Sequence, residues 1–206
     1  MSSPPKKPSP TGHHKLRIIG GRWRSRALSF PVVEGLRPTG DRIRETLFNW
    51  LAPILPGSRC LDLFAGSGIL GFEALSRGAD HCCLIERNPV AARQLRVNAD
   101  QLQAEKALIL QTSALEFLAR PASEAYHVVF IDPPFADNLW ELAMRLLNNG
   151  WLHEDALIYV EAPANLSLPL PNGWQTHREK RSGQVCYRLY RYETNGRYET
   201  KGDVGV

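Results

Sequence analysis

The sequence predicts an α/β fold in which a mainly parallel sheet carries helices on both faces. Short apolar segments alternate along the chain with segments of helical periodicity, and the apolar segments contain few polar residues. That composition is typical of strands buried on both faces of a sheet. A glycine-rich stretch follows the first of these strands, as it does in nucleotide-binding sheets. The last strands instead alternate by twos, which indicates an antiparallel hairpin.

The individual elements follow in a regular order. Asp41 is expected to cap a first helix, which ends at Pro53. Pro89 suits the first turn of a second helix, and Ser113 is expected to cap a short third helix. The apolar face of the first of these helices is Ile43, Leu47, Trp50 and Leu51. Strands are expected at residues 60–64, 81–86, 107–110, 126–131, 156–160, 174–180 and 185–192, and further helices at residues 69–77, 89–103, 114–118 and 138–147.

The chain is expected to contain one large domain, an appended hairpin and two tails. Residues 1–14 are rich in Ser, Pro, Lys and His and are predicted to be disordered, as are residues 193–206. Residues 15–35 are predicted to form a basic β-hairpin arm with Gly20-Gly21 as its turn. Residues 36–192 make up the main domain, and we find no internal repeat.

The net charge of +4 is unevenly distributed. Residues 1–50 contain ten Lys and Arg against three acids, which gives +7, so the remaining residues have a net charge of −3. A basic arm on a mildly acidic body is the pattern expected for a protein that binds a polyanion. A solvated basic tail without a partner is the alternative.

Composition also excludes several classes of protein. No apolar run reaches the length that spans a membrane, and the first residues lack the apolar core of a signal peptide. The four cysteines form no CxxC pair and lie in predicted strands, so we expect reduced core residues. The six histidines lack metal-ligand spacing, and no metal is expected. The expected location is the cytoplasm.

An acid, two prolines and an aromatic residue follow the strand at residues 126–131, namely Asp132, Pro133, Pro134 and Phe135. The prolines fix φ and have no N–H, so the carbonyls near them can face a ligand. The carboxylate and a carbonyl can accept the hydrogens of an amine while its planar ring stacks on Phe135. These residues are therefore the candidate catalytic site, although Asp and Pro are also ordinary turn residues.

The turn after the first strand has the composition of a ligand-binding loop. Gly66, Gly68 and Gly71 satisfy the pattern G-x-G-x-x-G, and such glycines let the backbone pass close under a ligand. Glu86 ends the next strand and could bind ribose hydroxyls, but this pattern fits a dinucleotide equally well. Asp62 would attract an ammonium and repel a pyrophosphate, so both acids together suit S-adenosylmethionine. The cofactor contacts predicted from these segments are Asp62, Phe64, Ala65, Gly66, Ser67, Gly68, Glu86, Arg87, Ser113, Ala114 and Asp132.

With these motifs in this order, the chain resembles the class I S-adenosylmethionine-dependent methyltransferases. Within them it is similar to the bacterial 16S ribosomal RNA guanine-N2 methyltransferase family that acts on the small subunit. The similarity spans about residues 15–192, and the closer match lies at residues 17–26, 37–49 and 62–68. The resemblance implies a Rossmann-like, mostly parallel sheet of seven strands with an antiparallel last strand. It also implies that Arg37 and Thr39 lie over the cofactor.

The resemblance further implies that the basic hairpin helps to hold ribosomal RNA. Trp23 is expected either to stack or to fill the core face of the hairpin. The other residues predicted to contact RNA are Lys15, Arg17, Arg22, Arg24, Arg26 and Arg42.

The predicted reaction is direct methyl transfer to the exocyclic N2 amine of a guanine in 16S rRNA, within a small-subunit or assembling particle, by a monomer. An adenine-N6 nucleic-acid methyltransferase remains open, because the residues after the fourth strand fit both bases. A nicotinamide-linked oxidoreductase with the same glycine pattern, or a binding module without catalysis, are alternatives from other classes.

Overall fold

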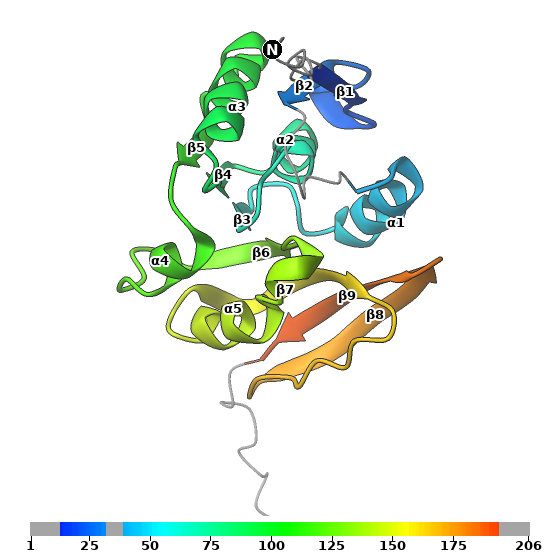
Figure 1. Cartoon of the computed structure of the whole chain (residues 1–206), viewed down its shortest axis with the longest axis vertical. Helices are drawn as coiled ribbons and strands as arrows, with labels where there is room; N and C mark the ends of the chain where they lie inside the picture. Colours follow the sequence, from blue (N-terminus) through cyan, green and yellow to red (C-terminus); the bar gives the residue numbers. More distant parts are fainter. Residues whose placement is uncertain (1–12, 32–38, 194–206) are drawn as a thin grey trace, which may run out of the picture.

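One seven-stranded sheet organises the fold (Figure 1), in the order β5-β4-β3-β6-β7-β9-β8. The computed structural model describes residues 13–31 and 39–193. The strands of this sheet are β3 (Arg59–Asp62), β4 (His81–Ile85), β5 (Ala107–Leu110), β6 (Tyr126–Ile131), β7 (Leu152–Pro163), β8 (Trp174–Ser182) and β9 (Val185–Tyr192). The helices are α1 (Asp41–Leu51), α2 (Ile69–Ser76), α3 (Pro89–Leu102), α4 (Ala114–Leu118) and α5 (Trp140–Leu147), with short 3₁₀ turns η1 (Gly21–Trp23) and η2 (Phe135–Asp137).

The strand directions confirm the predicted topology. Strands β3 to β7 are parallel to one another, whereas β9 runs antiparallel between β7 and β8. Strands β3, β4 and β5 follow one another toward one edge of the sheet, and β6 lies on the other side of β3, so the strand order reverses between β3 and β6. A crevice at such a reversal of strand order, outside the carboxyl ends of the strands, is where open α/β sheets bind ligands.

Alternate residues of the strands supply two apolar layers. Cys60 of β3 packs with α1, α2 and α3 on one face of the sheet, and Leu61 packs with α4 and α5 on the other. The prediction of a parallel sheet covered on both faces is therefore confirmed. All four cysteines are buried and unpaired, as predicted.

The N-terminal hairpin consists of β1 (His13–Arg17) and β2 (Ala27–Pro31), which pair antiparallel. The prediction that Gly20-Gly21 forms a tight turn between them is wrong, because residues 18–26 make a longer loop that contains η1. The two glycines instead allow this loop to approach the end of α2. A Cβ on Gly21, whose φ is +74°, would lie 2.7 Å from Ser76 Oγ, and one on Gly20 would lie 2.9 Å from Arg77 Nε.

The hairpin is packed on the domain rather than extended from it. Ile18, Trp23 and Leu28 are buried in the same layer as α2 and α3. Asn98 of α3 accepts a hydrogen bond from the Ser29 amide and donates one to the Ser29 carbonyl, at 3.3 and 2.8 Å. The loop and β2 are thus fixed to both helices.

Several predicted boundaries need correction. Strand β1 begins at His13, inside the tail predicted for residues 1–14, and the Glu193 amide, in the predicted second tail, donates to Gly173 O at 2.8 Å. The predictions for residues 1–12, 32–38 and 194–206 lie outside the described residues. Helix α5 starts at Trp140 rather than 138, because η2 and a left-handed Asn138 (φ +48°) precede it.

Helix α1 also differs from the prediction. Gly40 occupies the cap position, and Asp41 is the first helical residue without a capping hydrogen bond; its carboxylate pairs with Arg44 instead. The buried residues of the helix are Arg44, Leu47, Phe48 and Leu51, while the expected Ile43 and Trp50 are half-buried. Hydrophobic periodicity alone missed a buried arginine.

No helix in the described part of the chain is long and apolar enough to cross a membrane.

Candidate active site

Asp132 lies directly after β6, at the carboxyl edge of the sheet. Its Oδ2 accepts a hydrogen bond from Thr39 Oγ1 at 3.3 Å, which joins the segment before α1 to the residues after β6. Burial raises the pKa of Asp132 well above its usual range, and the charges of Glu161 and Asp62 act in the same direction. Raised pKa values of this kind are typical of carboxyl groups in functional sites.

Pro133, Pro134 and Phe135 continue this segment as a rigid bend. The Asp137 amide donates to the Pro134 carbonyl at 2.9 Å, which closes the short turn η2. The side chain of Phe135 is 44% exposed, and its ring lies 5.6 Å from that of buried Trp140. Because Trp140 supports one side of it, Phe135 presents a fixed aromatic surface to solvent beside Asp132.

Asp62 ends β3 beside this segment, because β3 and β6 are paired neighbours. Its Oδ2 accepts a hydrogen bond from the Gly71 amide at 3.2 Å. Burial raises the pKa of Asp62 to about 7, and the charge of Glu86 adds to this effect. The electrostatic neighbours that raise the pKa of each aspartate are other carboxylates, so a cationic ligand would be stabilised here.

Glu86, just beyond β4, binds the glycine loop. Its two carboxylate oxygens accept hydrogen bonds from the amides of Gly66 and Asn88, at 2.8 and 2.7 Å. A carboxylate has further lone pairs beyond these two bonds. Glu86 therefore shapes the loop and can still accept hydrogen bonds from a ligand's hydroxyls.

The loop from Phe64 to Gly68 passes from β3 to α2 through conformations that glycine favours. Gly66 and Gly68 have φ of +50° and +76°. A Cβ on Gly68 would also lie 2.7 Å from Phe72 Cε2. Ala65, before Gly66, and Ser67, between the two glycines, are buried, and the Ala65 amide donates to Ile85 O at 2.9 Å. The backbone therefore takes a tight path from β3 to α2, and the predicted position of a ligand against it stays a prediction.

Other predicted cofactor residues have identifiable structural roles. Ser113 caps α4 in a reciprocal capping box with Glu116, and Ala114 is buried in the layer below. Arg87 pairs with Asp137 of η2 at 2.8 Å and so links the end of β4 to the bend after Asp132. Arg37 lies outside the described residues.

Glu161 is a site residue that the sequence reasoning missed. It lies in β7, next to β6, and its Oε2 accepts a hydrogen bond from Tyr159 OH at 2.7 Å. Its carbonyl accepts from the Trp140 indole at 2.7 Å. The available signal was an acid directly after the apolar run at residues 156–160. Within the described residues, no group of three or more His, Cys, Asp and Glu could hold a metal ion.

The predicted RNA contacts divide into surface and core. Lys15, Arg17, Arg22, Arg24, Arg26 and Arg42 are exposed. Trp23 was expected either to stack on RNA or to fill the core face of the hairpin. It is only 8% exposed and lies in the core, so the structure shows the packing role. The Arg22 guanidinium lies 4.1 Å from the centre of the Trp23 ring, and Arg26 donates to the Gln101 carbonyl at 3.0 Å. These arginines are held in place on the surface of the domain.

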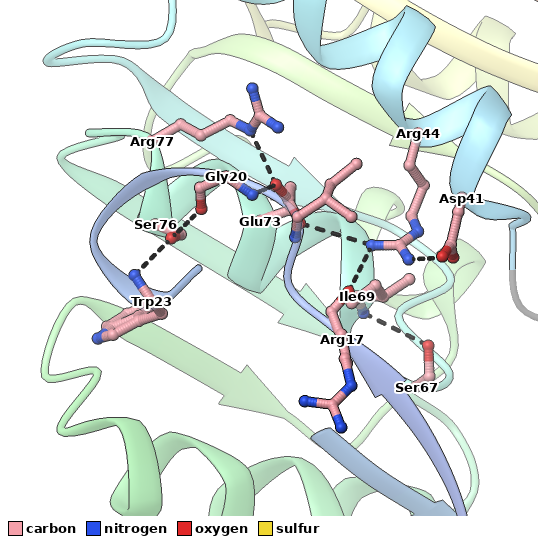
Figure 2. Close-up of polar contacts among 11 residues, drawn as sticks. Arg17, Gly20, Trp23, Asp41, Arg44, Ser67, Ile69, Glu73, Ser76 and Arg77 are labelled. Carbon is pink, nitrogen blue, oxygen red and sulfur yellow. Dashed lines mark hydrogen bonds and ion pairs between the residues drawn. The ribbon is translucent and has the colours of Figure 1, made fainter. Parts of the chain in front are cut away.

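A buried carboxylate fixes the N-terminal loop to α2 (Figure 2). Glu73 is fully buried and accepts hydrogen bonds from the amides of Ile19 and Gly20 and from Arg77 Nε, each at 2.8 Å. Ser76, one turn later in α2, donates to Gly20 O at 2.6 Å and accepts from the Trp23 amide at 2.9 Å.

Arg44 extends this network to α1. Its fully buried guanidinium lies 3.5 Å from Glu73 and 2.6 Å from Asp41, and it donates to the Arg17 carbonyl at 3.0 Å. Helix α2 starts at the glycine loop, and Asp41 is two residues from Thr39. The basic hairpin, the glycine loop and the segment next to Asp132 are therefore parts of one connected structure.

The sheet order, the glycine loop and the acids at its edge are those of a class I S-adenosylmethionine-dependent methyltransferase. The tRNA m1G37 methyltransferase of M. jannaschii, 12% identical, has the same fold, with a TM-score of 0.62 over 88% of this chain and 57% of that one.

Closer relatives narrow this class to one family. The family described as Conserved hypothetical protein 95 matches residues 16–191, and the chain belongs to it. The chain is 50% identical to the ribosomal RNA small subunit methyltransferase D of Escherichia coli (strain K12), over 93% of this chain and 97% of that protein. The protein of the same name from Haemophilus influenzae is 48% identical, over 88% and 96%. The solved structure of Escherichia coli yhhF is 48% identical, with a TM-score of 0.81 over 87% of this chain and 99% of that one.

Proposed function

We propose that this protein methylates the exocyclic N2 amine of a guanine in 16S ribosomal RNA, using S-adenosylmethionine. The observation that carries the proposal is that Asp132 and exposed Phe135 lie in one short bend after β6, and that Asp62 and the glycine loop follow the neighbouring strand β3. The relatives named for methylation of small-subunit rRNA support the substrate class. We further propose that the enzyme acts as a monomer in the cytoplasm on a small-subunit or assembling particle.

The residues around the glycine loop fit this cofactor. Burial and neighbouring carboxylates raise the pKa of Asp62 and of Asp132. A positively charged ligand would stabilise both carboxylates in their ionised form. Asp62 would hold the ammonium group and Glu86 the ribose hydroxyls, while Gly66 and Gly68 let the backbone approach the ligand closely. When bound, S-adenosylmethionine supplies an electrophilic methyl group on a sulfonium.

The chain's own part in the reaction is to hold the amine. Its lone pair is delocalised into the purine, so it is a weak nucleophile. The Asp132 carboxylate and a carbonyl near Pro133 would accept its two hydrogens and direct the lone pair toward the methyl group. The raised pKa of Asp132 suits a group that takes the proton as the new bond forms. Thr39 fixes the orientation of the carboxylate through its hydrogen bond.

The guanine would reach Asp132 only after leaving its stack. Phe135 offers a replacement surface, and stacking of a base on an aromatic side chain contributes roughly 1–3 kcal/mol. Holding the reactants in line supplies several kcal/mol more, on the order of seven in favourable cases. Adenine N6 presents the same two hydrogens, so these contacts also fit the adenine alternative. The relatives named as methyltransferases, at 48 to 50% identity, disfavour the nicotinamide-linked alternative.

The test is transfer of a labelled methyl group to unmodified 16S rRNA, naked and assembled, with the modified nucleoside identified by mass spectrometry. N2-methylguanosine at one position is the expected product, and N6-methyladenosine would overturn the base assignment. Asp132→Ala should lower kcat at least a hundredfold and leave calorimetric cofactor affinity nearly unchanged. Asp100→Ala, at an exposed acid of α3, is the control and should behave as wild type. Equal losses of turnover and cofactor affinity in Asp132→Ala would contradict the role of Asp132.

A further inference from the structure

The hairpin of β8 and β9 contains a basic surface separate from the N-terminal arm. Residues 174–192 contain five Lys and Arg against one acid, a net charge of +4, whereas residues 51–173 have a net charge of −6. The acidic body thus carries one basic element from its N-terminal part and a second one at the edge strand of its sheet. The basic residues of the second element are Arg178, Lys180, Arg181, Arg188 and Arg191.

Three of these side chains present their charge to solvent. Arg178, Lys180 and Arg181 are exposed in β8. The one acid of the strand, Glu179, is engaged by Arg188 at 2.7 Å. Within residues 13–31 and 39–193, no ion pair involves any of the three exposed residues. Arg178 and Lys180 lie on one face of β8, and Arg181 lies on the other face next to the turn. Unneutralised cations along an exposed edge strand are the kind of surface that binds phosphates.

An aromatic platform adjoins this cluster. The ring of Trp50, from α1, stacks on Tyr187 of β9 with centroids 5.7 Å apart. The ammonium group of Lys180 lies 5.9 Å from the centre of the Trp50 ring. Tyr187 is buried, so half-buried Trp50 is the ring open to a ligand. A partly exposed aromatic ring among cations is typical of surfaces that bind single-stranded nucleic acid.

The hairpin turn lies at the same edge of the sheet as the active site. Pro163, at the end of β7, is paired with Val185, and the Ala164 amide donates to Gln184 O at 2.8 Å. The parallel neighbour of β7 is β6, which ends beside Asp132. From β6 to β8 there are three strand spacings of about 4.8 Å, or about 14 Å. Figure 1 shows the turned end of the β8–β9 hairpin directed toward α1.

The two basic elements flank the catalytic edge. The N-terminal hairpin packs on α2 and α3, on the β3, β4 and β5 side, while β8 is the opposite edge of the sheet. A polyanion that crosses the carboxyl ends of β3 and β6, where Asp62 and Asp132 lie, would have a basic element on either side. Charged residues along an exposed edge strand also disfavour pairing with a strand of another protein, so RNA fits this surface better than a β-strand partner.

We propose that Arg178, Lys180 and Arg181, with Trp50 beside them, form a second RNA-binding surface that holds the substrate strand downstream or upstream of the flipped base. This inference rests on the proposed function, because it names a further contact of the same substrate. The bound group is the phosphate backbone, and stacking on Trp50 adds a sequence-tolerant contact.

The test replaces Arg178, Lys180 and Arg181 together by alanine. The charge-matched control replaces Lys106, Arg120 and Arg145, which are exposed and belong to segments outside both basic elements. Affinity for unmodified 16S rRNA, naked and assembled, is measured over a series of salt concentrations, together with KM, kcat and cofactor affinity. Each lost phosphate contact reduces the slope of log K against log salt by about 0.7 to 0.9.

The triple variant should lose about two units of this slope and raise KM for RNA at least tenfold, with kcat and cofactor affinity within twofold of wild type. The pair Arg178→Ala and Arg181→Ala, which keeps Lys180 over Trp50, should show a smaller loss in the same direction. A triple variant with the slope and KM of the control would overturn the second surface while leaving the proposed function intact. A wild-type protein that methylates no rRNA would instead overturn the proposed function, and this inference with it.

Discussion

Replacing Glu73 by alanine removes the acceptor that fixes the N-terminal loop to α2 (Figure 2). Its carboxylate is fully buried and bonds two backbone amides and Arg77 at 2.8 Å, with Arg44 at 3.5 Å. Each buried amide left without a partner costs about 1–3 kcal/mol. Removal of one partner from a buried ion pair costs about 3–5 kcal/mol. The two estimates count some of the same contacts and are not added. We therefore expect Glu73→Ala to lower the free energy of unfolding by about 3–5 kcal/mol.

Urea unfolding followed by fluorescence measures this loss, which is a large part of the roughly 5–15 kcal/mol of a typical domain. Hydrogen exchange at the amides of Ile19 and Gly20 should accelerate in Glu73→Ala, because both lose their acceptor. Glu45→Ala, an exposed residue of α1, is the control and should change the free energy by less than about 0.5 kcal/mol. A loss below about 1 kcal/mol in Glu73→Ala, with unchanged exchange, would refute the assignment of Glu73 as the anchor of the loop.

Three further predictions concern the site. Because burial raises the pKa of Asp62 to about 7, the folded state binds more protons than the unfolded state between about pH 4 and 7. The free energy of unfolding, measured by denaturation, should therefore fall as pH rises through this range, and cofactor affinity, measured by calorimetry, should increase up to about pH 7. Both trends should be flattened in Asp62→Asn. Gly68→Ala, with φ at +76° and Phe72 only 2.7 Å from the new Cβ, should cost about 2–4 kcal/mol by the same denaturation assay, whereas Gly40→Ala, with open space around it, should cost little. Phe135→Ala should lower kcat/KM for RNA by roughly 5- to 150-fold without changing cofactor affinity, and Phe135→Tyr should retain activity.

Local sequence signals were sufficient for much of the sheet. Strands β5, β6 and β9 and helix α4 have the predicted bounds, because apolar runs between turn residues and the Ser113 capping box are set by neighbours in sequence. The acids at the strand ends, Asp62, Glu86 and Asp132, were predictable for the same reason. In a parallel sheet, residues that follow the strands meet at one edge whatever the exact packing.

Contacts between distant segments were not predictable in this way. Arg44 occupies a core position because Glu73, 29 residues later, and the Arg17 carbonyl bind its guanidinium in addition to Asp41, and no local pattern predicts those two distant contacts. The Gly20-Gly21 pair looked like a hairpin turn, but its function is close approach to α2. Glu161 and the Arg87–Asp137 pair belong to the site only through the order of the strands and the bend after β6.

The distribution of charge explains how one surface could bind both a cation and a polyanion. The carboxylates at the catalytic edge raise one another's pKa, so the empty site loses stability at neutral pH that a bound sulfonium and ammonium would restore. The same carboxylates repel phosphates from the reacting position. Two groups of exposed basic residues lie instead on the N-terminal hairpin and on β8, to either side. Under the proposed function, an RNA strand held at both flanks would place an uncharged, hydrogen-donating base edge against Asp132, and the charge pattern would then contribute to substrate selection.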